Sequence, residues 1–451
     1  MRNELGISRG VDWVMVWFYI IFVSIGLLCI FSVEYNSSDN ILQNIVGLKK
    51  NYSRQLLFIG MCAIIAILIL LTDSKLFTAT ANLGYVFGII LILITFVVGK
   101  NIGGSRSWIP LGFFNIQPVE TCKIFAALAL SKYLSRPETN FENAKSQAIA
   151  AAIALTPAIF SILQNETGLA LVYFAFLIPM YREGLPPIYL IIGFSVAILV
   201  VATILVDKNL LAMILTGIAI AVIYMMRKSI KKDKGILVVI LGIWLLCVSI
   251  QRFAVPYFFQ NVLKPYQVER ILNTFGVDYL PDATTKELDA QELKELSIEK
   301  VKKKAKENYN VKQSKIAIGS GGFWGKGFLK GTQTQGDFVP EQHTDFIFTS
   351  VGENFGFWGS SLVIIFFMLF MLRIVFIAER QRSTFSRVYA YSVLAIFFFH
   401  VSINIFMTIG LAPVIGITLP LISYGGSSLL TFTVLTFILI RLDADRQMIL
   451  R

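Results

Sequence analysis

The chain has 451 residues, of which 56% are hydrophobic and only 15% charged, and its mean hydropathy is +0.70. Soluble domains carry about 45–50% apolar and roughly 25% charged residues, so this composition excludes an ordinary soluble protein and predicts a membrane protein. The net charge of +12 does not predict a nucleic-acid partner, because the basic residues gather in short loops between apolar runs. The cysteines lie in or beside apolar runs and predict neither disulfides nor a metal site; they are Cys29, Cys62, Cys122 and Cys247.

Twelve apolar runs are long enough to cross a bilayer core of about 30 Å, which takes roughly 20 helical residues. The first run, from Val14 to Val33, is not followed by a small-residue cleavage site, so we interpret it as a span rather than a signal peptide. We therefore predict an all-α polytopic membrane protein with about twelve transmembrane helices. The runs are 13–33, 55–72, 82–98, 117–134, 147–163, 168–181, 187–206, 210–226, 235–251, 346–372, 388–410 and 413–440.

The Lys and Arg residues of the short loops predict the orientation of the chain. The loop 227–234 has five basic residues and one acid, and the loop 373–387 has four arginines against Glu379. With twelve spans, both loops lie on the side of the N-terminus and of the arginine-containing C-terminal tail, so we expect both termini in the cytoplasm. On this topology the remaining polar, Gly-rich and Pro-rich loops share the outer face; they are 99–116, 164–167, 252–345 and 411–428.

The spans divide the chain into three predicted parts. A membrane domain of nine helices covers residues 1–251, a long outer loop covers 252–345, and the last three helices with a short tail cover 346–451. Within the loop, residues 277–312 contain eight acidic and eight basic side chains. We interpret this insertion as a solvated charged helix, with docking to an outer partner as the alternative.

Four outer segments contain ionisable residues at the membrane boundary. The first reads G-G-S-R-S-W-I-P-L-G, with Arg106 and Trp108, and is followed by Q-P-V-E-T-C-K, with Glu120 and Lys123. Charged side chains are costly at membrane depth, so they are functional candidates; an indole also favours the interface by itself. The second segment, Q-N-E-T-G, places Glu166 near the boundary, either as a helix cap or as the partner of a base such as Arg106.

The third segment surrounds the long loop. It begins with P-Y-Q-V-E-R-I-L at 265–272, resumes as Q-S-K-I-A-I-G-S-G-G-F-W-G-K-G, which contains Lys326, and ends in P-E-Q-H-T-D-F-I-F, which contains Asp345. Partial desolvation before the following apolar run would raise the pKa of Asp345 towards that of a general base. A helix N-cap is the alternative role. Glu341 and His343 are weak candidates for a metal site with Asp345.

The fourth segment, 404–428, combines apolar residues with helix breakers. Pro413, Pro420 and the pair 425–426 interrupt the helical pattern at membrane depth, next to Ser423. Such irregular backbone is tolerated where it lines a cavity or is covered by protein, so we predict a cavity wall. Two further features receive structural interpretations: His400 as a packed, hydrogen-bonded residue within a span, and D-A-D at 443–445 as a surface charge pair.

Together the four segments closely resemble those of the SEDS family (shape, elongation, division and sporulation), and most closely its elongation members. L-P-L-I-S-Y-G-G-S-S and P-E-Q-H-T-D-F-I-F are the most diagnostic motifs, and the resemblance extends from about residue 100 to 440 except for the insertion. It implies a peptidoglycan glycosyltransferase that joins lipid II into glycan strands. The family commonly has ten spans, so an extra helix pair is expected within 187–251. The family's Q-P-D-x-G appears here as Q-N-E-T-G.

The resemblance also implies roles for individual residues. Asp345 matches the catalytic Asp of the family's H-T-D motif, and the reaction would invert the anomeric centre and release undecaprenyl diphosphate. The candidate substrate-binding residues are Trp108, Arg106, Lys123, Glu120, Glu166, Lys326 and Ser423. A divalent cation such as Mg²⁺ or Mn²⁺ could assist. The expected partners are lipid II, the growing glycan strand, a class B penicillin-binding protein and membrane lipids.

The expected location is the bacterial inner (plasma) membrane, with the active site on the outer side. Two other functions fit a polytopic protein with charged residues and broken helices in its membrane region. One is a flippase for lipid II, and the other is a non-catalytic scaffold for cell-wall synthases.

Overall fold

The computed structural model describes residues 10–35, 40–102, 105–110, 112, 115–262, 268 and 309–446. Most of the insertion 277–312 and of the motif 265–272 lies outside these residues, so the interpretation of the insertion as a charged helix stays a prediction. The chain forms two compact units: unit 1 comprises Met1–Pro186 and Asn310–Arg451, and unit 2 comprises Pro187–Tyr309.

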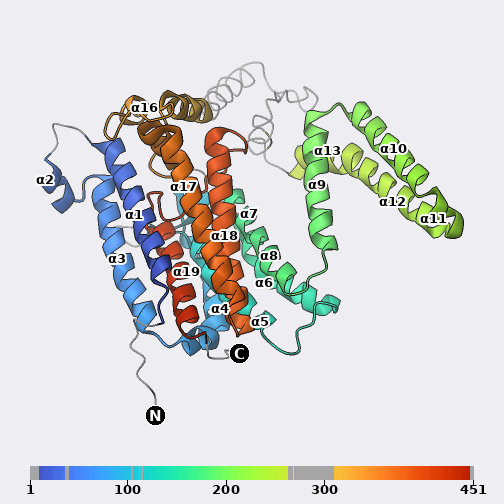
Figure 1. Cartoon of the computed structure of the whole chain (residues 1–451), viewed down its shortest axis with the longest axis horizontal. Helices are drawn as coiled ribbons and strands as arrows, with labels where there is room; N and C mark the ends of the chain where they lie inside the picture. Colours follow the sequence, from blue (N-terminus) through green and yellow to red (C-terminus); the bar gives the residue numbers. More distant parts are fainter. Residues whose placement is uncertain are drawn as a thin grey trace, which may run out of the picture. The chain divides into compact units, whose positions relative to one another are not determined.

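The predicted all-α fold is confirmed. In the described part of the chain the only sheet is antiparallel and three-stranded, with β1 (Lys100–Ile102), β2 (Ser105–Pro110) and β3 (Asn115–Ile116) in that order. Every other regular element of unit 1 is helical (Figure 1). The helices are α1 (Trp13–Glu34), α2 (Ile41–Val46), α3 (Asn51–Leu71), α4 (Ser74–Val98), α5 (Pro118–Leu134), α6 (Ala144–Leu163), α7 (Thr167–Tyr173), η2 (Phe174–Phe176), α8 (Leu177–Arg182), α16 (Thr332–Gln335), α17 (Ile347–Glu379), α18 (Thr384–Ile409) and α19 (Gly426–Ala444), with a further helix at 309–320.

The helices agree closely with the apolar runs. Within the described ranges, ten helices are long and apolar enough to cross a membrane. The predicted runs 117–134 and 168–181 form the shorter α5 and the interrupted stretch Thr167–Arg182. The last run differs most, because 411–425 is not helical and α19 begins only at Gly426. The proline and glycine residues of the fourth segment thus break the helix, as predicted.

Local sequence explains where several helices begin and end. The side chain of Asp12 accepts a hydrogen bond from the N–H of Met15 at 3.2 Å, which caps α1. Pro118 opens α5, where its missing N–H leaves no hydrogen bond unmade. α18 ends at Gly410, whose φ of +77° is a left-handed conformation that glycine adopts without strain.

α17 is broken within its first third, near the end that contains Asp345. Gly356 has φ +64° and ψ −155°, and a Cβ there would meet the backbone nitrogen of Gly325 at 2.4 Å. The carbonyls of residues 353–354 accept hydrogen bonds from the N–H groups of residues 326–327 at 3.0 Å, and the N–H of Phe357 donates to Gly322 at 2.8 Å. The Gly-rich loop therefore supplies backbone partners that the interrupted helix lacks, which makes the break compatible with membrane depth.

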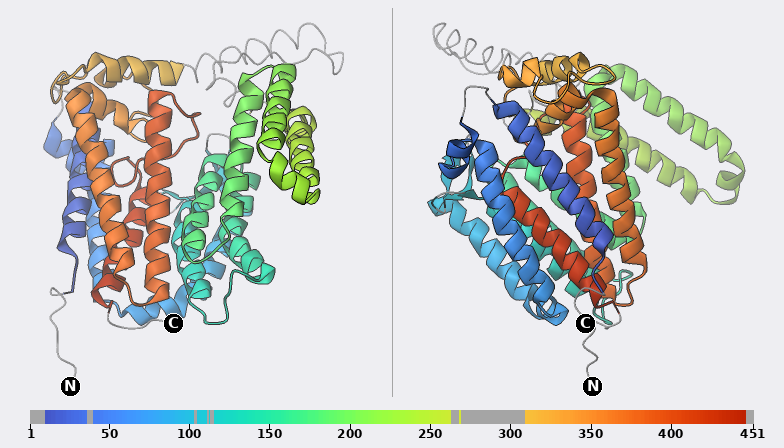
Figure 2. Two further views of the ribbon diagram at one scale, coloured as in Figure 1. Left: turned by 45° about the vertical axis from the view of Figure 1, so that its right-hand side comes forward. Right: turned by 60° about the vertical axis from the view of Figure 1, so that its left-hand side comes forward.

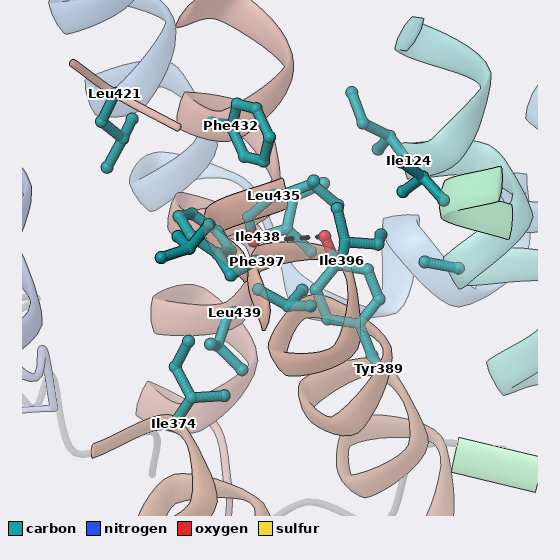
Figure 3. Close-up of a cluster of buried hydrophobic side chains, with 14 of the residues drawn as sticks. Ile124, Ile374, Tyr389, Ile396, Phe397, Leu421, Phe432, Leu435, Ile438 and Leu439 are labelled. Carbon is teal, nitrogen blue, oxygen red and sulfur yellow. Dashed lines mark hydrogen bonds between the residues drawn. The ribbon is translucent and has the colours of Figure 1, made fainter. Parts of the chain in front are cut away.

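The core of unit 1 is a stack of aromatic and branched side chains between α1, α17, α18 and α19, helices that lie side by side in Figure 2. The rings of Phe22 and Phe367 stack with centroids 4.2 Å apart. Figure 3 shows Phe397 and Tyr389 of α18 among these side chains, and the Tyr389 hydroxyl donates to the carbonyl of Leu435 at 3.3 Å. Packing and hydrogen bonds of this kind hold membrane helices together, because lipid tails are as apolar as the helices themselves.

An ion-pair network joins three helices at the end of unit 1 opposite the outer loops. Asp12 accepts hydrogen bonds from Arg373 at 2.7 Å and from Arg380 at 2.8 Å, and Arg380 also binds Asp443. Burial raises the pKa of Asp12, but the bonds from both arginines and from Met15 outweigh it and hold the pKa below its usual range. The interpretation of 443–445 as a surface charge pair is wrong for Asp443, which is fully buried in this network.

The four predicted outer segments meet at the other end of unit 1. Ser107 binds Glu166, Ser423 binds Thr344, and a Cβ on Gly168 would meet the carbonyl oxygen of Ile415 at 2.3 Å. The predicted common face of loops 99–116, 164–167, 411–428 and the end of 252–345 is thereby confirmed.

Unit 2 contains α9 (Ile188–Leu205), α10 (Lys208–Met225), α11 (Arg227–Lys232), α12 (Gly235–Ser249), η3 (Ile250–Ala254), α13 (Val255–Tyr257) and η4 (Phe258–Val262). α10 and α12 pack together, with Trp244 Nε1 donating to Thr216 Oγ1 at 3.2 Å. Three candidate spans lie here: α9, α10 and 235–261. The predicted runs 187–206, 210–226 and 235–251 are thus each helical, and the extra helix pair expected within 187–251 stays a prediction.

The buried network predicts a large difference between two arginine variants. Arg380→Ala leaves the carboxylate of Asp443 buried without its nearest cation, which typically costs about 3–5 kcal/mol. Arg182→Ala removes an exposed pair with Glu379 and should cost only about 0–1 kcal/mol. The free energy of unfolding in mixed micelles, followed by tryptophan fluorescence, measures both. Equal losses would contradict a stabilising role for the buried network.

Candidate active site

Three consecutive backbone carbonyls, those of residues 343–345, are each held by a donor from the last part of the chain. The donors are the N–H of Tyr424, the hydroxyl of Ser423 and the side-chain amide of Asn404, at 2.8, 2.6 and 2.8 Å respectively. We call this set of bonds the carbonyl clamp. Because the clamp holds the backbone on both sides of it, Asp345 occupies a fixed place against the segment 411–425.

The carboxylate of Asp345 lies between the aqueous end and the core. The side chain is partly buried, and the next residue, Phe346, is only 1% exposed. Its Oδ2 faces Gly416, where an added Cβ would approach to 3.4 Å. The N-cap residue of α17 is Phe346, whose side chain makes no capping bond, so Asp345 does not occupy the N-cap position that the sequence offered it.

The sequence also suggested Glu341 and His343 as weak candidates for a metal site with Asp345, but in the structure their side chains contact other residues. Glu341 Oε2 accepts a hydrogen bond from Thr344 Oγ1 at 3.1 Å, and His343 Nε2 lies 3.8 Å from Glu34 Oε1. Across the described ranges, no group of three His, Cys, Asp or Glu side chains could hold a metal ion. Asp345, Glu341 and His343 therefore do not form a three-ligand metal site with one another, and the help of a divalent cation stays a prediction.

Lys123 and Glu120 lie in a buried polar cluster. Lys123 is fully buried, its Nζ is 2.8 Å from His400 Nε2 and 3.7 Å from Glu120 Oε1, and it lies over the ring of Phe432, 5.4 Å from the centroid. His400 Nδ1 is 3.2 Å from the carbonyl oxygen of Thr418. The interpretation of His400 as a packed, hydrogen-bonded residue is confirmed, and its bonds connect α5 to the segment 411–425.

β2 connects the first two outer segments. Alternate side chains of a strand point to opposite faces, and Ser105 and Ser107 are buried while Arg106 is exposed and Trp108 partly exposed. Ser107 Oγ donates to Glu166 Oε1 at 2.7 Å. This bond replaces both expected roles of Glu166, because its side chain makes no capping bond and, among the described residues, forms no ion pair with Arg106. One face of β2 therefore presents Arg106 and Trp108 together.

Lys326 and Ser423 have structural partners. Lys326 Nζ pairs at 2.7 Å with Glu353, which also accepts the N–H groups of Gln333 and Thr334 at 2.8 Å. Ser423 accepts the N–H of Leu419 at 2.8 Å, and its single hydroxyl proton is used in the clamp. Substrate binding by either residue gains no support from these contacts and stays a prediction.

Sequence reasoning missed two residues that organise this end. Glu353 orders the loop above α17, and Asn404 holds Asp345. Both are polar residues inside long apolar runs, and polar residues in such runs are costly unless they have partners. That signal was available for both, although their partners are far away in the sequence.

The fold and these contacts define a polytopic helical membrane protein with an aspartate in a clamped backbone segment and a buried Glu–Lys–His cluster towards one end. Residues 12–213 and 188–448 match the family described as cell cycle protein, which comprises FtsW, RodA and SpoVE. The chain belongs to this family, and the resemblance to the SEDS proteins is thereby confirmed. The protein is a multi-pass bacterial membrane protein.

Relatives match over most of the chain. The peptidoglycan glycosyltransferase RodA of Treponema pallidum is 29% identical over 97% of this chain and 99% of its own length. The peptidoglycan glycosyltransferase MrdB of Escherichia coli K12 is 28% identical over 87% of this chain and 85% of its own.

Solved structures show the same fold. A chain of a peptidoglycan synthase complex superposes with a TM-score of 0.65 and 22% identity, covering 97% of this chain and 98% of that one. The crystal structure of the Thermus thermophilus rod shape determining protein RodA gives a TM-score of 0.59 at 20% identity, with the same coverage.

His343 gives a prediction on pH. Burial lowers the pKa of His343, and the nearby carboxylates of Glu34, Asp337 and Glu341 only partly oppose this, so the folded pKa lies below the usual value of 6.5. Below about pH 6.5 the unfolded chain binds the proton more readily, so stability should fall as the pH drops through this window. The difference in unfolding free energy between pH 7.5 and 5.5 should be smaller in His343→Gln. An equal difference in both proteins would contradict the lowered pKa.

Proposed function

We propose that this protein is a peptidoglycan glycosyltransferase that polymerises lipid II into glycan strands during cell elongation. Relatives aligned over nearly the whole chain carry this activity in their names. The observation that carries the proposal within the structure is the carbonyl clamp. It fixes the backbone at Asp345, the residue in the position of the catalytic Asp of the family motif, and the N-cap position of α17 falls to Phe346 instead.

In the proposed reaction, the carboxylate of Asp345 takes the proton from the 4-hydroxyl of an incoming GlcNAc. The freed oxygen attacks the anomeric carbon of the lipid-linked MurNAc from the side opposite the diphosphate, so the configuration inverts. The bond to undecaprenyl diphosphate breaks, and this group leaves as a stable anion. A general base typically contributes about 10²–10⁴-fold, and a backbone held by the clamp restricts the positions that this carboxylate can take.

The leaving diphosphate needs positive charge, and two residues can supply it. Arg106 is exposed on the same face of β2 as Trp108 and could reach a headgroup at the membrane surface. Lys123 is enclosed and paired with His400, so it acts as a fixed charge within the protein rather than as a mobile clamp. A guanidinium binds a diphosphate through two parallel hydrogen bonds, which suits Arg106 to direct contact.

We infer that the end bearing Asp345 faces the outer side of the inner membrane. Arg380, Arg382 and Arg387, which follow α17 at the opposite end of unit 1, support this, because basic loops of this kind remain in the cytoplasm. A class B penicillin-binding protein that cross-links the strands is the proposed partner; one structural neighbour belongs to a peptidoglycan synthase complex.

Replacing the proposed base gives the first test. Asp345→Asn removes the base while keeping the side-chain shape, and should lower strand formation by about 10²–10⁴-fold. The assay is purified protein with its partner and labelled lipid II, analysed on a gel that resolves glycan strands. Asp337→Asn is the matched control, because its amide oxygen can still accept the bond from Gln342.

The outcomes separate the possible functions. Strands from Asp345→Asn at the wild-type rate would exclude Asp345 as the base. No strands from the wild type, under conditions where the partner complex forms and lipid II binds, would favour a flippase or a scaffold.

The charge on β2 gives a second test. Arg106→Ala should reduce the rate by about 10²-fold, the lower end of the range for losing one donor to a developing anion. Arg106→Lys should recover part of the rate, because an ammonium group keeps the positive charge but cannot make the two parallel hydrogen bonds of a guanidinium. Arg136→Ala, an exposed arginine just after α5, serves as the control. Similar rates for all three variants would contradict the role of Arg106.

A further inference from the structure

Two polar residues lie one helical turn apart within the apolar run of α18. His400 and Asn404 are both fully buried. Polar side chains at membrane depth are retained where they have partners, and they commonly mark functional sites. The proposed reaction assigns neither residue a chemical step.

Each residue joins the segment 411–425 to a charged residue of the site. Asn404 Nδ2 donates to the carbonyl oxygen of Ile417 at 2.7 Å and to that of Asp345 at 2.8 Å. His400 reaches the next carbonyl, that of Thr418, through Nδ1 and reaches Lys123 through Nε2. One face of α18 thus bonds two consecutive carbonyls of the segment 411–425. The same two side chains also bond Asp345 and Lys123.

The partners fix the proton positions. The Thr418 carbonyl can only accept, so His400 Nδ1 carries the hydrogen. An ammonium group can only donate, so Nε2 must be the bare acceptor for Lys123. Both carbonyl partners of Asn404 likewise require its NH₂ group, because the flipped amide would set oxygen against two oxygens. A neutral imidazole protonated on Nδ1 is the form that makes both bonds of His400.

We propose that His400 and Asn404 are positioning residues, through which α18 holds Lys123 and Asp345 in a fixed relation across the segment 411–425. The inference rests on the proposed function and deepens it. His400 accepts a hydrogen bond from Lys123 at 2.8 Å, whereas Glu120 is 3.7 Å away. Without the imidazole acceptor, Lys123 would turn fully to Glu120, and its charge would be neutralised there rather than held towards the site.

The proton position can be measured without an activity assay. The chain has two histidines, so the spectrum of protein labelled with ¹⁵N-histidine contains two imidazoles. His343→Gln leaves His400 alone and assigns its signals. We expect a neutral ring at pH 7 with the proton on Nδ1. A proton on Nε2, or an imidazolium ring, would overturn the proposed bond to Lys123.

Kinetics test the consequence for the reaction. His400→Phe keeps the ring that packs edge-on against Phe432, at 4.9 Å between centroids, but removes both nitrogens. Displacing a catalytic group by about 1 Å can cost about 10²-fold, so we expect kcat for strand formation to fall by about 10–100-fold with little change in KM for lipid II. His400→Gln retains a donor and an acceptor and should recover much of the loss. Phe398→Leu, on an exposed position of α18, is the control.

A variant of Asn404 tests the same positioning role. Asn404→Asp keeps the volume but sets a carboxylate against two carbonyl oxygens, so kcat should fall at least as far as in His400→Phe. If the wild type forms strands and His400→Phe or Asn404→Asp matches it, the positioning role is wrong. A loss in His400→Gln as deep as in His400→Phe would also overturn it. If the wild type forms no strands, the proposed function fails, while the ¹⁵N measurement still decides the bond to Lys123.

Discussion

The structure depends on the need to satisfy every backbone polar group at membrane depth. Lipid offers no hydrogen bonds, so a non-helical segment such as 411–425 is stable only where the protein supplies partners. Here the partners are side chains of Ser423, Asn404 and His400. Other hydrogen bonds of these same side chains connect them to Thr344, Asp345 and Lys123. The requirement that keeps the broken segment in place therefore also sets the position of the proposed base. Chemistry and stability share one network, so a substitution in this network is expected to affect both.

The sequence predicted the features that depend on hydropathy and on helix breakers. The apolar runs became helices because burial in lipid or protein favours them, and Pro413, Pro420 and Gly425 lie in the non-helical segment between α18 and α19. The common face of the outer loops followed from counting spans. Features that depend on distant partners could not be predicted in the same way. The pairing of Lys326 with Glu353, and the burial of Asp443, arise only once α17 has packed against its neighbours.

The starts of two helices also differ from what the local sequence predicts, because distant partners decide them. Asp345 is a favourable N-cap in sequence, yet α17 begins two residues later, because the clamp holds the carbonyls of 343–345 in a non-helical arrangement. Glu166 likewise stands at the N-cap of α7 without capping it, since Ser107 uses its carboxylate. In both cases a tertiary hydrogen bond overrides a local preference, and both cases fall at the candidate site. Departures from local preference are expected where function constrains the chain.

The break at Gly356 matters for the thickness of the membrane that the protein can occupy. An unbroken helix over all 33 residues of α17 would be about 50 Å long at about 1.5 Å per residue. The hydrocarbon layer is about 30 Å thick, so such a helix would have to tilt steeply or distort the surrounding lipid. The break leaves residues 357–379, a stretch of about 34 Å, which spans the layer at a tilt of about 30°, within the usual range. Hydrophobic matching thus gives the break at Gly356 a structural consequence that is independent of catalysis.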